Sequence, residues 1–461
     1  MLAEADRVSA VSDAPRRVPT PAGRGPFGDI FRFRRDPVRT LFAAWRECGD
    51  LARLRLGAVT AYLAVHPDSV QHVLQGNAKN YNKQTRGFTK LKLALGEGLL
   101  TSEGSFWRRQ RRIIQPVFHK ERLEGFATTM VEATARMLDR WTGNKRPFDV
   151  AAEMTALTLD IIGRTMFSAQ LGDDSRMLID SVTLGARHIN ERITSLTGVL
   201  EVSERIPTPK NRRFWASMQG GDDLIRRVVE ERRRSGEDKG DLLSMLMGTR
   251  DEDTGETMSD QQLRDEVVTI FSAGHETTAL ALTWAFYLLS THPEVERRLR
   301  EEIETLGGKA PALADLPRLA FTGRVIKESM RLFPPAWAIS RRAEKEDALG
   351  GYPLPAQAFV LLCPYITHRH PAFWENPEGF DPDRFLPERM KSQHRFAYLP
   401  FGAGARMCIG SGFAMMEAQL VLASVVQHFR LNLVPGHPVD LDPLITLRSR
   451  AGMQMTLQPM A

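Results

Sequence analysis

A glycine-rich loop around one cysteine is the segment of this sequence best suited to chemistry. The loop runs Phe401-Gly-Ala-Gly-Ala-Arg-Met-Cys-Ile-Gly410, which reads F-x-x-G-x-R-x-C-x-G. Its glycines allow the backbone to approach a ligand closely. A helix predicted to begin near Ser411 would direct its N–H groups at the sulfur of Cys408, which lowers a thiol pKa and favours the thiolate.

A thiolate with no other Cys or His beside it is a poor zinc site, because zinc takes four protein ligands or three and a water. The same thiolate is a good axial ligand for haem iron. Arg406 could then pair with an acidic group of the macrocycle. The alternative is a structural cysteine in a turn, which the complete pattern disfavours. Cys363 is a weaker candidate, because its run LLCPY has no glycines, and Cys48 carries no pattern.

The loop resembles the haem-binding signature of the cytochrome P450 superfamily of haem-thiolate monooxygenases, and the chain is similar to its soluble bacterial members. The resemblance implies a mainly α fold with small β-sheets and a long central helix over a buried haem. The residues themselves also predict a mainly α fold, because helical patterns dominate the chain from Asp36 onward. Residues 1–25 lack hydrophobic periodicity and are predicted to be a flexible tail. The absence of a clear linker predicts a single haem domain at 26–461. Haem b (iron protoporphyrin IX) would be held by the Cys408 thiolate, with Phe401, Arg406 and Gly410 also binding the cofactor.

Glu328-Ser-Met-Arg331 has the spacing E-x-x-R, which lets the two charged groups face each other on a helix. Alone, such a pair is usually a surface salt bridge worth less than ~1 kcal/mol. Here two prolines follow it, and an FDPDRF segment lies downstream. Together these resemble the family's buried Glu–Arg–Arg network, which gives Glu328, Arg331 and Arg384 a structural role. Gln357 departs from the family pattern, which usually has glycine there.

A second polar motif, Ala273-Gly-His-Glu-Thr-Thr278, lies within a predicted helix. It is no H-E-x-x-H zinc motif, because Ala279 stands where the second His is required. Ala273, Gly274 and Thr277 share one face, and Thr277 can donate to the Ala273 carbonyl. A mid-helix glycine indicates close approach of another group, which could be simple helix packing. The resemblance implies an oxygen-activation groove, in which Glu276 and Thr277 relay protons and Ala273 and Gly274 adjoin the cofactor.

Trp107-Arg-Arg-Gln-Arg111 places an indole N–H and a guanidinium on one helical face, and both groups suit a carboxylate. By resemblance, Trp107 and Arg111 would bind a haem propionate, and Arg341 fits a further propionate position. The basic run WRRQRR could instead bind nucleic acid, although such runs are more often solvated helix faces. The run RRVVEERRR at 226–234 is interpreted as an exposed helix face.

The resemblance implies a reaction in which one atom of O2 enters a C–H or C=C bond of an apolar substrate and the other becomes water. Electrons would come from NAD(P)H through a separate donor, such as an acidic ferredoxin with its reductase. Terpenoid, steroid, fatty acyl and polyketide compounds all remain possible substrates. By family position, the pocket would be lined by the long helix, by the segment at 81–100 and by the following side chains: Phe88, Ala336, Trp337, Ile339 and Met453.

The sequence leaves other functions open. A haem-thiolate peroxygenase or isomerase would keep Cys408 without needing Glu276 and Thr277. A non-catalytic haem protein would need no pocket. A nucleic-acid-binding protein would show salt-dependent affinity for DNA and no visible chromophore.

A long helix must carry the central motif. Ser259 and Gln262 form an S-x-x-Q capping box, apolar residues recur after it, and the helix is predicted to end near Ser290. At ~1.5 Å per residue such a helix crosses a whole domain. Short β-like runs are predicted at 51–56, 60–65 and 359–362. Strands and turns are predicted for the last fifty residues.

The composition is that of an ordinary globular protein: of 461 residues, 42% are hydrophobic and 26% charged. The net charge of +6 is mild for this length and permits an acidic partner protein without indicating nucleic acid. Three cysteines cannot form a disulfide framework and fit a reducing compartment. No apolar run reaches the ~20 residues of a membrane helix, and no signal peptide is evident. We expect a cytoplasmic monomer.

Overall fold

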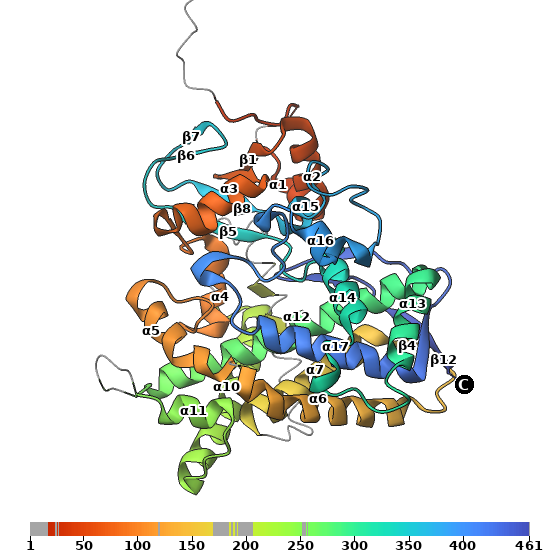
Figure 1. The fold of residues 1–461 in the computed structure, drawn as a ribbon. Coiled ribbons are helices and arrows are strands. Elements are labelled where there is room, and N and C mark those ends of the chain that lie inside the picture. Colours follow the sequence, from red (N-terminus) through yellow and green to blue (C-terminus); the bar gives the residue numbers. More distant parts are fainter. Residues whose placement is uncertain are drawn as a thin grey trace, which may run out of the picture.

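The structure is a computed structural model. It describes residues 17–168 and 206–460 apart from 24, 26, 119, 251–254 and 256, together with 184, 185, 188, 189 and 191. Helices dominate this part of the chain and the strands form small sheets, so the predicted fold class is confirmed. Figure 1 shows most helices gathered around α12, with the largest sheet and the N-terminal helices at one end.

The helices have the following bounds: α1 Ile30–Arg35, α2 Pro37–Cys48, α3 Pro67–Gln71, α4 Arg86–Leu95, α5 Gly104–Ile114, α6 Lys120–Trp141, α7 Val150–Phe167, α10 Pro209–Ser235, α11 Leu242–Gly248, α12 Asp260–Thr291, α13 Pro293–Glu304, α14 Ala320–Leu332, α15 Pro364–Thr367, α16 Pro387–Met390 and α17 Ser411–His428. The strands are β1 Leu51–Leu56, β2 Val59–Ala64, β3 Tyr81–Asn82, β4 Phe148–Asp149, β5 Ile339–Ala343, β6 Asp347–Leu349, β7 Tyr352–Leu354, β8 Phe359–Leu362, β9 Phe429–Leu433, β10 Leu441–Pro443, β11 Leu447–Ser449 and β12 Gln454–Pro459.

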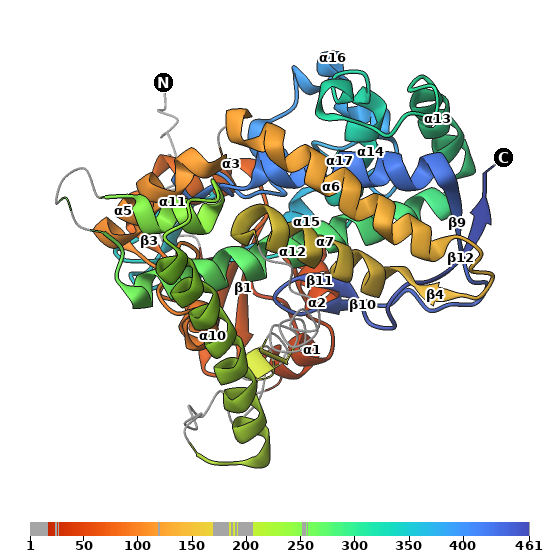
Figure 2. The ribbon, with the colours of Figure 1, turned by 90° about the horizontal axis from the view of Figure 1, so that it is seen from below.

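The long predicted helix is α12, and its predicted start is confirmed. Ser259 Oγ accepts from the Gln262 N–H at 3.2 Å, and Gln262 Oε1 accepts from the Ser259 N–H at 3.0 Å, so the capping box is complete. The second half of α12 is buried on nearly every side, which explains its continuous apolar run. Seen from below in Figure 2, α12 passes through the middle of the helices, where α7, α14 and α17 contact it.

The largest sheet has the strand order β1-β2-β8-β5-β3. β1 and β2 pair antiparallel, β2 and β8 pair parallel, and β5 and β8 pair antiparallel. The predicted runs at 51–56 and 359–362 match β1 and β8, and β2 begins and ends one residue before its prediction. The last fifty residues form the strands β9 to β12, as predicted, and the turn between β10 and β11 reaches back to α12.

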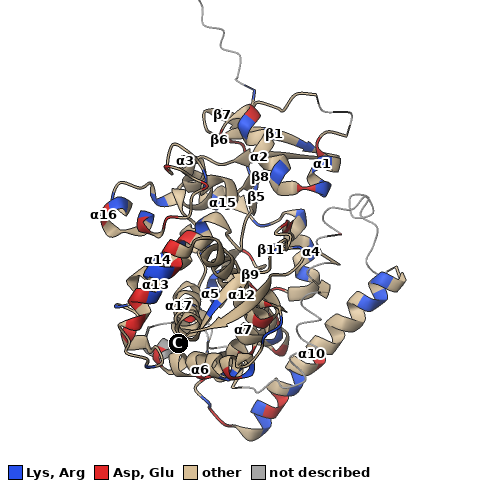
Figure 3. Ribbon diagram, turned by 90° about the vertical axis from the view of Figure 1, so that its right-hand side faces the viewer, with Lys and Arg blue, Asp and Glu red and all other residues tan. Residues whose placement is uncertain are grey.

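Two segments, the predicted flexible tail and the predicted exposed face of α10, contain buried residues. In the described part of the predicted tail, Val18 is buried, and the Pro19 carbonyl accepts from the Arg53 N–H at 2.7 Å. The basic run on α10 was predicted to be exposed, and for Arg232 this is wrong. Arg232 is buried and donates two bonds of 2.8 Å to Asp241. Figure 3 shows basic and acidic residues interspersed along the ribbon of α10.

None of the helices in the described part of the chain combines the length and the apolar composition that crossing a bilayer requires.

Candidate active site

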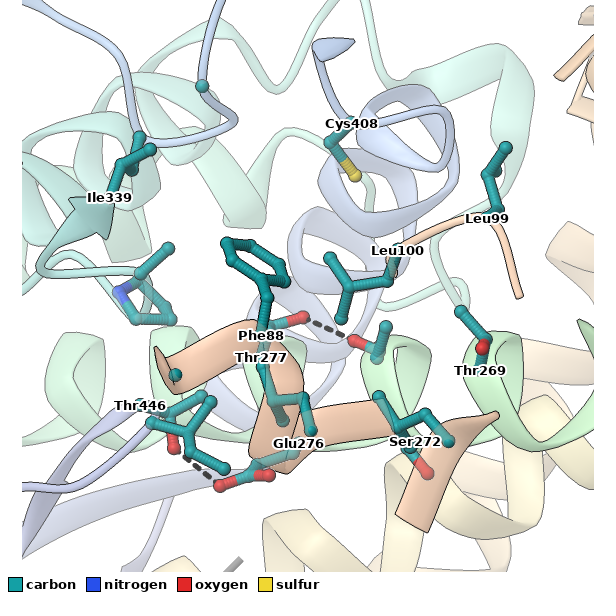
Figure 4. Close-up of a pocket in the computed structure, with 18 of the residues that line it drawn as sticks. Phe88, Leu99, Leu100, Thr269, Ser272, Glu276, Thr277, Ile339, Cys408 and Thr446 are labelled. Carbon is teal, nitrogen blue, oxygen red and sulfur yellow. Dashed lines mark hydrogen bonds between the residues drawn. The ribbon is translucent and has the colours of Figure 1, made fainter. Parts of the chain in front are cut away.

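A cavity of about 830 Å³ separates α12 from the loop that carries Cys408. Figure 4 shows the sulfur of Cys408 on one side of this space and the side chains of α12 on the other. Most of the lining is apolar, and the volume is within the range of ligand-binding cavities. The two motifs with the strongest chemical patterns, far apart in the sequence, therefore face the same cavity.

The cysteine loop is held in a tight conformation at Gly404. This residue has φ +68°, and a Cβ here would collide with the Leu74 carbonyl oxygen, so no other residue fits without a shift. The Cys408 N–H donates to the Phe401 carbonyl at 2.9 Å, and α17 begins at Ser411, as predicted. The loop thus presents Cys408 to the cavity from the start of a helix.

The pKa of Cys408 differs from the prediction. Burial among protein atoms raises the pKa of this thiol, while the Gly410 N–H and the charge of Arg111 act in the opposite direction without outweighing it. The side chain nonetheless remains accessible from the cavity. A cation at the sulfur would reverse the balance, because direct coordination by a metal ion deprotonates a thiol.

Cys363 does not compete for this role. It is fully buried behind β8, its Sγ lies 3.4 Å from the Trp337 carbonyl oxygen, and burial raises its pKa to about 12. It is absent from the cavity lining.

Arg406 occupies the cavity wall together with Trp107. The Arg406 guanidinium lies 3.8 Å from the centre of the Trp107 ring and pairs with Glu103 at 2.9 Å. Arg111 also lines the cavity and donates to the Met407 carbonyl at 2.8 Å. The predicted contact residues Trp107, Arg111 and Arg406 are therefore brought together around the cysteine loop.

Two more cations extend this group. Arg341 and Lys83 are both buried, and both line the cavity. Burial and the neighbouring Arg406 lower the pKa of Arg341 to about 10. Burial, Arg341 and Arg406 lower the pKa of Lys83. Among the described residues, Glu103 is the acid that offsets these charges.

The cation group of Lys83, Arg341 and Arg406 therefore contains more basic side chains than its one neighbouring acid, Glu103, can pair with. Buried charges are costly unless they are paired, so this wall suits an anionic ligand with two carboxylates. The two propionates of haem b have this charge. The donor set beside Cys408 thus fits the cofactor that the sequence predicts.

On α12, the Thr277 hydroxyl donates to the Ala273 carbonyl at 2.8 Å, as predicted. A Cβ on Gly274 would lie 2.8 Å from Ile162 Cδ1, so at this residue the close approach is made by α7. Ala273, Gly274 and Thr277 all line the cavity. Gly274 therefore serves helix packing on one side while its backbone borders the cavity on the other.

Glu276 is adjacent to Thr277 but bonds elsewhere. Its Oε1 accepts from Arg448 Nε at 2.7 Å and from the Thr446 hydroxyl, both contributed by the β10–β11 segment (Figure 4). The carboxylate therefore borders the cavity in a fixed position, held by the C-terminal hairpin.

The predicted pocket residues Phe88, Ala336, Trp337 and Ile339 all line the cavity. Met453 is not among the residues that line this cavity. Met453 is fully buried in the core, and its N–H donates to Asp149 Oδ1 at 2.8 Å because β12 pairs with β4 there. The terminal segment contributes residues 443–446 to the cavity instead.

The E-x-x-R pair forms a buried network away from the cavity. Arg331 Nε and Nη2 donate to the two Glu328 oxygens at 2.7 and 2.8 Å, and neither side chain is exposed. Arg384 Nε donates to Glu328 Oε1 at 3.2 Å. Glu328, Arg331 and Arg384 therefore meet as one cluster. Gln357, at the departure from the family pattern, adopts φ +65°, a conformation that normally favours glycine.

Sequence reasoning missed Glu103, Thr446 and Arg448, and it did not single out Lys83 within the segment at 81–100. None of them belongs to a motif, and each reaches the site through a contact between segments distant in the chain. Ser272 belongs to the long helix that was predicted to line the pocket, but it was not singled out, although it directly precedes the motif at 273–278 and lines the cavity.

Comparison with known proteins gives a consistent result. Residues 19–453 match the family model described as Cytochrome P450. The chain is 41% identical to cyclooctatin synthase of Streptomyces melanosporofaciens, with 94% of each chain covered. It is 38% identical to cyclooctat-9-en-7-ol 5-monooxygenase of the same organism, with 93% of each covered. It is 36% identical to pentalenene oxygenase of Streptomyces avermitilis, over 91% of this chain and 92% of that one.

The fold has a close counterpart among solved structures. The crystal structure of the cytochrome P450DA heme domain superposes with a TM-score of 0.88 and 27% sequence identity, covering 97% of this chain and 98% of that one.

Proposed function

Because the chain belongs to the cytochrome P450 family of haem-thiolate monooxygenases, we propose that it oxygenates a terpenoid, with Cys408 as the haem ligand. The overall change is R–H + O2 + 2 e⁻ + 2 H⁺ → R–OH + H2O. The observation that carries the proposal is the cavity itself, in which one cysteine, an excess of buried cations and a polar stretch of α12 face one apolar space.

Cys408 would bind the iron, and Lys83, Arg341 and Arg406 would receive the propionates. The bound haem would supply the activation of O2, with the thiolate donating the electron density that favours O–O cleavage. Arg111 lies near enough to Cys408 to stabilise the ionised sulfur. The stacked Arg406 and Trp107 would hold this end of the cavity rigid.

Thr277 and Glu276 would handle the two protons. The Thr277 O–H already donates to the Ala273 carbonyl, so the lone pairs of its oxygen remain available to accept a bond from the cavity. Glu276 lies on the same wall and is held by Arg448 and Thr446. This arrangement fixes a hydroxyl oxygen and a carboxylate, both able to accept a hydrogen bond, beside one another before the substrate arrives.

The terpenoid substrate class rests on two supports. The three relatives are named for cyclooctatin, cyclooctat-9-en-7-ol and pentalenene. The cavity is lined largely by apolar side chains, including Phe88, Leu99 and Ile339. Such a lining binds a hydrocarbon skeleton by removing its surface from water.

An acidic ferredoxin would supply the electrons at the surface nearest Cys408. Met407, the residue before it, is 41% exposed. Helix α5 adjoins this loop through Arg111 and also carries Arg108 and Arg112, both exposed and four residues apart (Figure 3). A basic helix beside an exposed apolar residue suits electrostatically steered docking of an acidic protein.

The test of the thiolate site is the difference spectrum of the reduced, carbon monoxide-treated protein. We expect the long-wavelength band of a thiolate-bound haem in the wild type, its loss in Cys408→Ser, and its retention in the control Cys363→Ser. If the haem-loaded wild type lacks the band, or Cys408→Ser keeps it, Cys408 is not the ligand.

The test of the electron donor is the salt dependence of turnover with ferredoxin. Turnover should fall as ionic strength rises. Arg108→Gln should raise KM for ferredoxin by about 2- to 5-fold, because an exposed charge contributes at most about 1 kcal/mol. The control Arg39→Gln, on α2, should not. Equal effects of the two variants would place the donor elsewhere.

A further inference from the structure

Two hydroxyl groups of α12 depart from the pattern set by the others. Thr277, Thr278 and Thr283 each donate to the carbonyl four residues earlier, which is the usual bond of a hydroxyl within a helix. Thr269 and Ser272 make no such bond and have no other hydrogen-bond partner among the described residues. Both lie in the wall of the cavity.

The other hydroxyls of the cavity wall are already partnered. Thr85 and Ser340 bond each other at 2.9 Å, and Thr446 donates to Glu276. The two exceptions differ in access. The Thr269 hydroxyl is enclosed, and a Cβ on Gly98 would collide with it. Ser272 is only partly buried and lies beside the open space (Figure 4). Ser272 is therefore the unpartnered hydroxyl that a bound molecule can reach.

The position of Ser272 relates it to the reacting end of the cavity. It lies one helical turn before Glu276, which is roughly 6 Å along the axis of α12. In Figure 4, Ser272, Glu276 and Thr277 follow one another along the wall that faces Cys408. A group bound at Ser272 would therefore sit to one side of the atoms that react and fix the orientation of the rest of the molecule.

A fully hydrocarbon substrate would cover Ser272 and leave its hydroxyl without a partner, which opposes binding. A substrate with an oxygen at that point would satisfy the hydroxyl and keep the rest of its skeleton against the apolar wall. Because a serine hydroxyl both donates and accepts, an alcohol on the substrate can bond to it in either direction.

We propose that Ser272 is the specificity-determining residue that binds a hydroxyl already present on the substrate, so that this enzyme oxidises a terpenoid alcohol in preference to the parent hydrocarbon. The proposal rests on the proposed function, since it names the substrate class for the same cavity. It also places the enzyme after another reaction, because an earlier oxygenation or hydration must supply the alcohol.

The test compares matched pairs of ligands on the haem-loaded protein. Polycyclic terpene hydrocarbons and their monoalcohols, with cedrane and cedrol among them, are titrated, and Kd is measured from the spin-state shift and by calorimetry. We expect the wild type to bind at least one alcohol about 2- to 10-fold more tightly than its hydrocarbon, the range of one neutral hydrogen bond. Ser272→Ala should lose this preference and bind the hydrocarbon as well as the wild type or better.

Thr269→Val is the matched control. It removes an equally unpartnered hydroxyl on the same helix, but one that Gly98 covers, so the preference for alcohol should remain. The proposal is overturned if no alcohol binds more tightly than its hydrocarbon, if Ser272→Ala keeps the preference, or if Thr269→Val loses it equally. None of these results would overturn the proposed function, because the carbon monoxide difference spectrum tests that function independently.

Discussion

Replacing Glu328 should show how much more a buried ion pair contributes to the free energy of unfolding than a surface ion pair does. Its carboxylate accepts two bonds from Arg331, one from Arg384 Nε and one from the Asp381 N–H at 3.0 Å. The remaining Arg331 donors bond to the carbonyls of residues 368, 377 and 379. Replacing Glu328 with Gln preserves the shape but removes the charge that balances Arg331.

The expected magnitude follows from burial. Neither Glu328 nor Arg331 is exposed to solvent, so water cannot stabilise the guanidinium once its counter-charge is lost. Removing one partner of such a pair typically lowers the free energy of unfolding by about 3–5 kcal/mol. The unfolding equilibrium constant would rise by a factor of roughly 10² to 10⁴.

The assay is urea unfolding of the haem-loaded protein, followed by tryptophan fluorescence and by haem release. The control is Glu294→Gln, which breaks a 2.6 Å ion pair with Arg297 on the exposed face of α13. This variant should unfold nearly as the wild type does, because water and salt screen the pair. The reasoning is refuted if Glu328→Gln loses less than about 1 kcal/mol, or if both variants are destabilised equally.

Three further predictions concern pH, packing and proton handling. Burial and the charge of Arg331 lower the pKa of His368 to about 3. Below about pH 6.5 the unfolded chain therefore binds a proton that the folded chain does not, and the free energy of unfolding should fall by up to about 1.4 kcal/mol per pH unit. Urea unfolding between pH 4 and 7 should show a shallower dependence of this free energy on pH in His368→Gln, and an unchanged dependence would contradict the assignment. Gly98→Ala should destabilise the protein by about 1–3 kcal/mol, because the new Cβ would meet Thr269 and the Asp265 carbonyl. Gly125→Ala, on the open face of α6, should instead stabilise the protein by about 1 kcal/mol. Thermal unfolding of the two variants tests this contrast, and the reasoning fails if both change stability in the same direction. Arg448→Leu should release Glu276 and reduce the product formed per NAD(P)H by several-fold. The loss should be smaller than in Glu276→Gln, because a proton-transferring group itself contributes about 10²–10⁴-fold. If Arg448→Leu forms as much product per NAD(P)H as the wild type, the position of Glu276 is unimportant.

The features predicted correctly from the sequence depend on neighbours close in the chain. The capping box of α12, the Thr277–Ala273 bond and the start of α17 after the cysteine loop each involve residues within about four positions, or one helical turn, of one another. Such spacings are fixed by helix geometry, so residue types alone predict them. The fold class followed for the same reason, because long amphipathic and apolar runs specify helices locally.

The features that the sequence missed depend on how distant segments close around the cavity. Met453 and Thr446 both lie in turns of the C-terminal strands, and nothing in their residue types says which turn enters the site. The pairing of β12 with β4 and β9 determines which turn borders the cavity. This pairing places Met453 in the core and leaves the β10–β11 turn against α12. The pKa of Cys408 is a similar case. The helix start and Arg111 act locally to lower it, but burial by the whole fold outweighs them until a cation binds the sulfur. Local pattern therefore predicts which groups carry a chemical motif, whereas tertiary closure determines the pKa and position that these groups have in the folded chain.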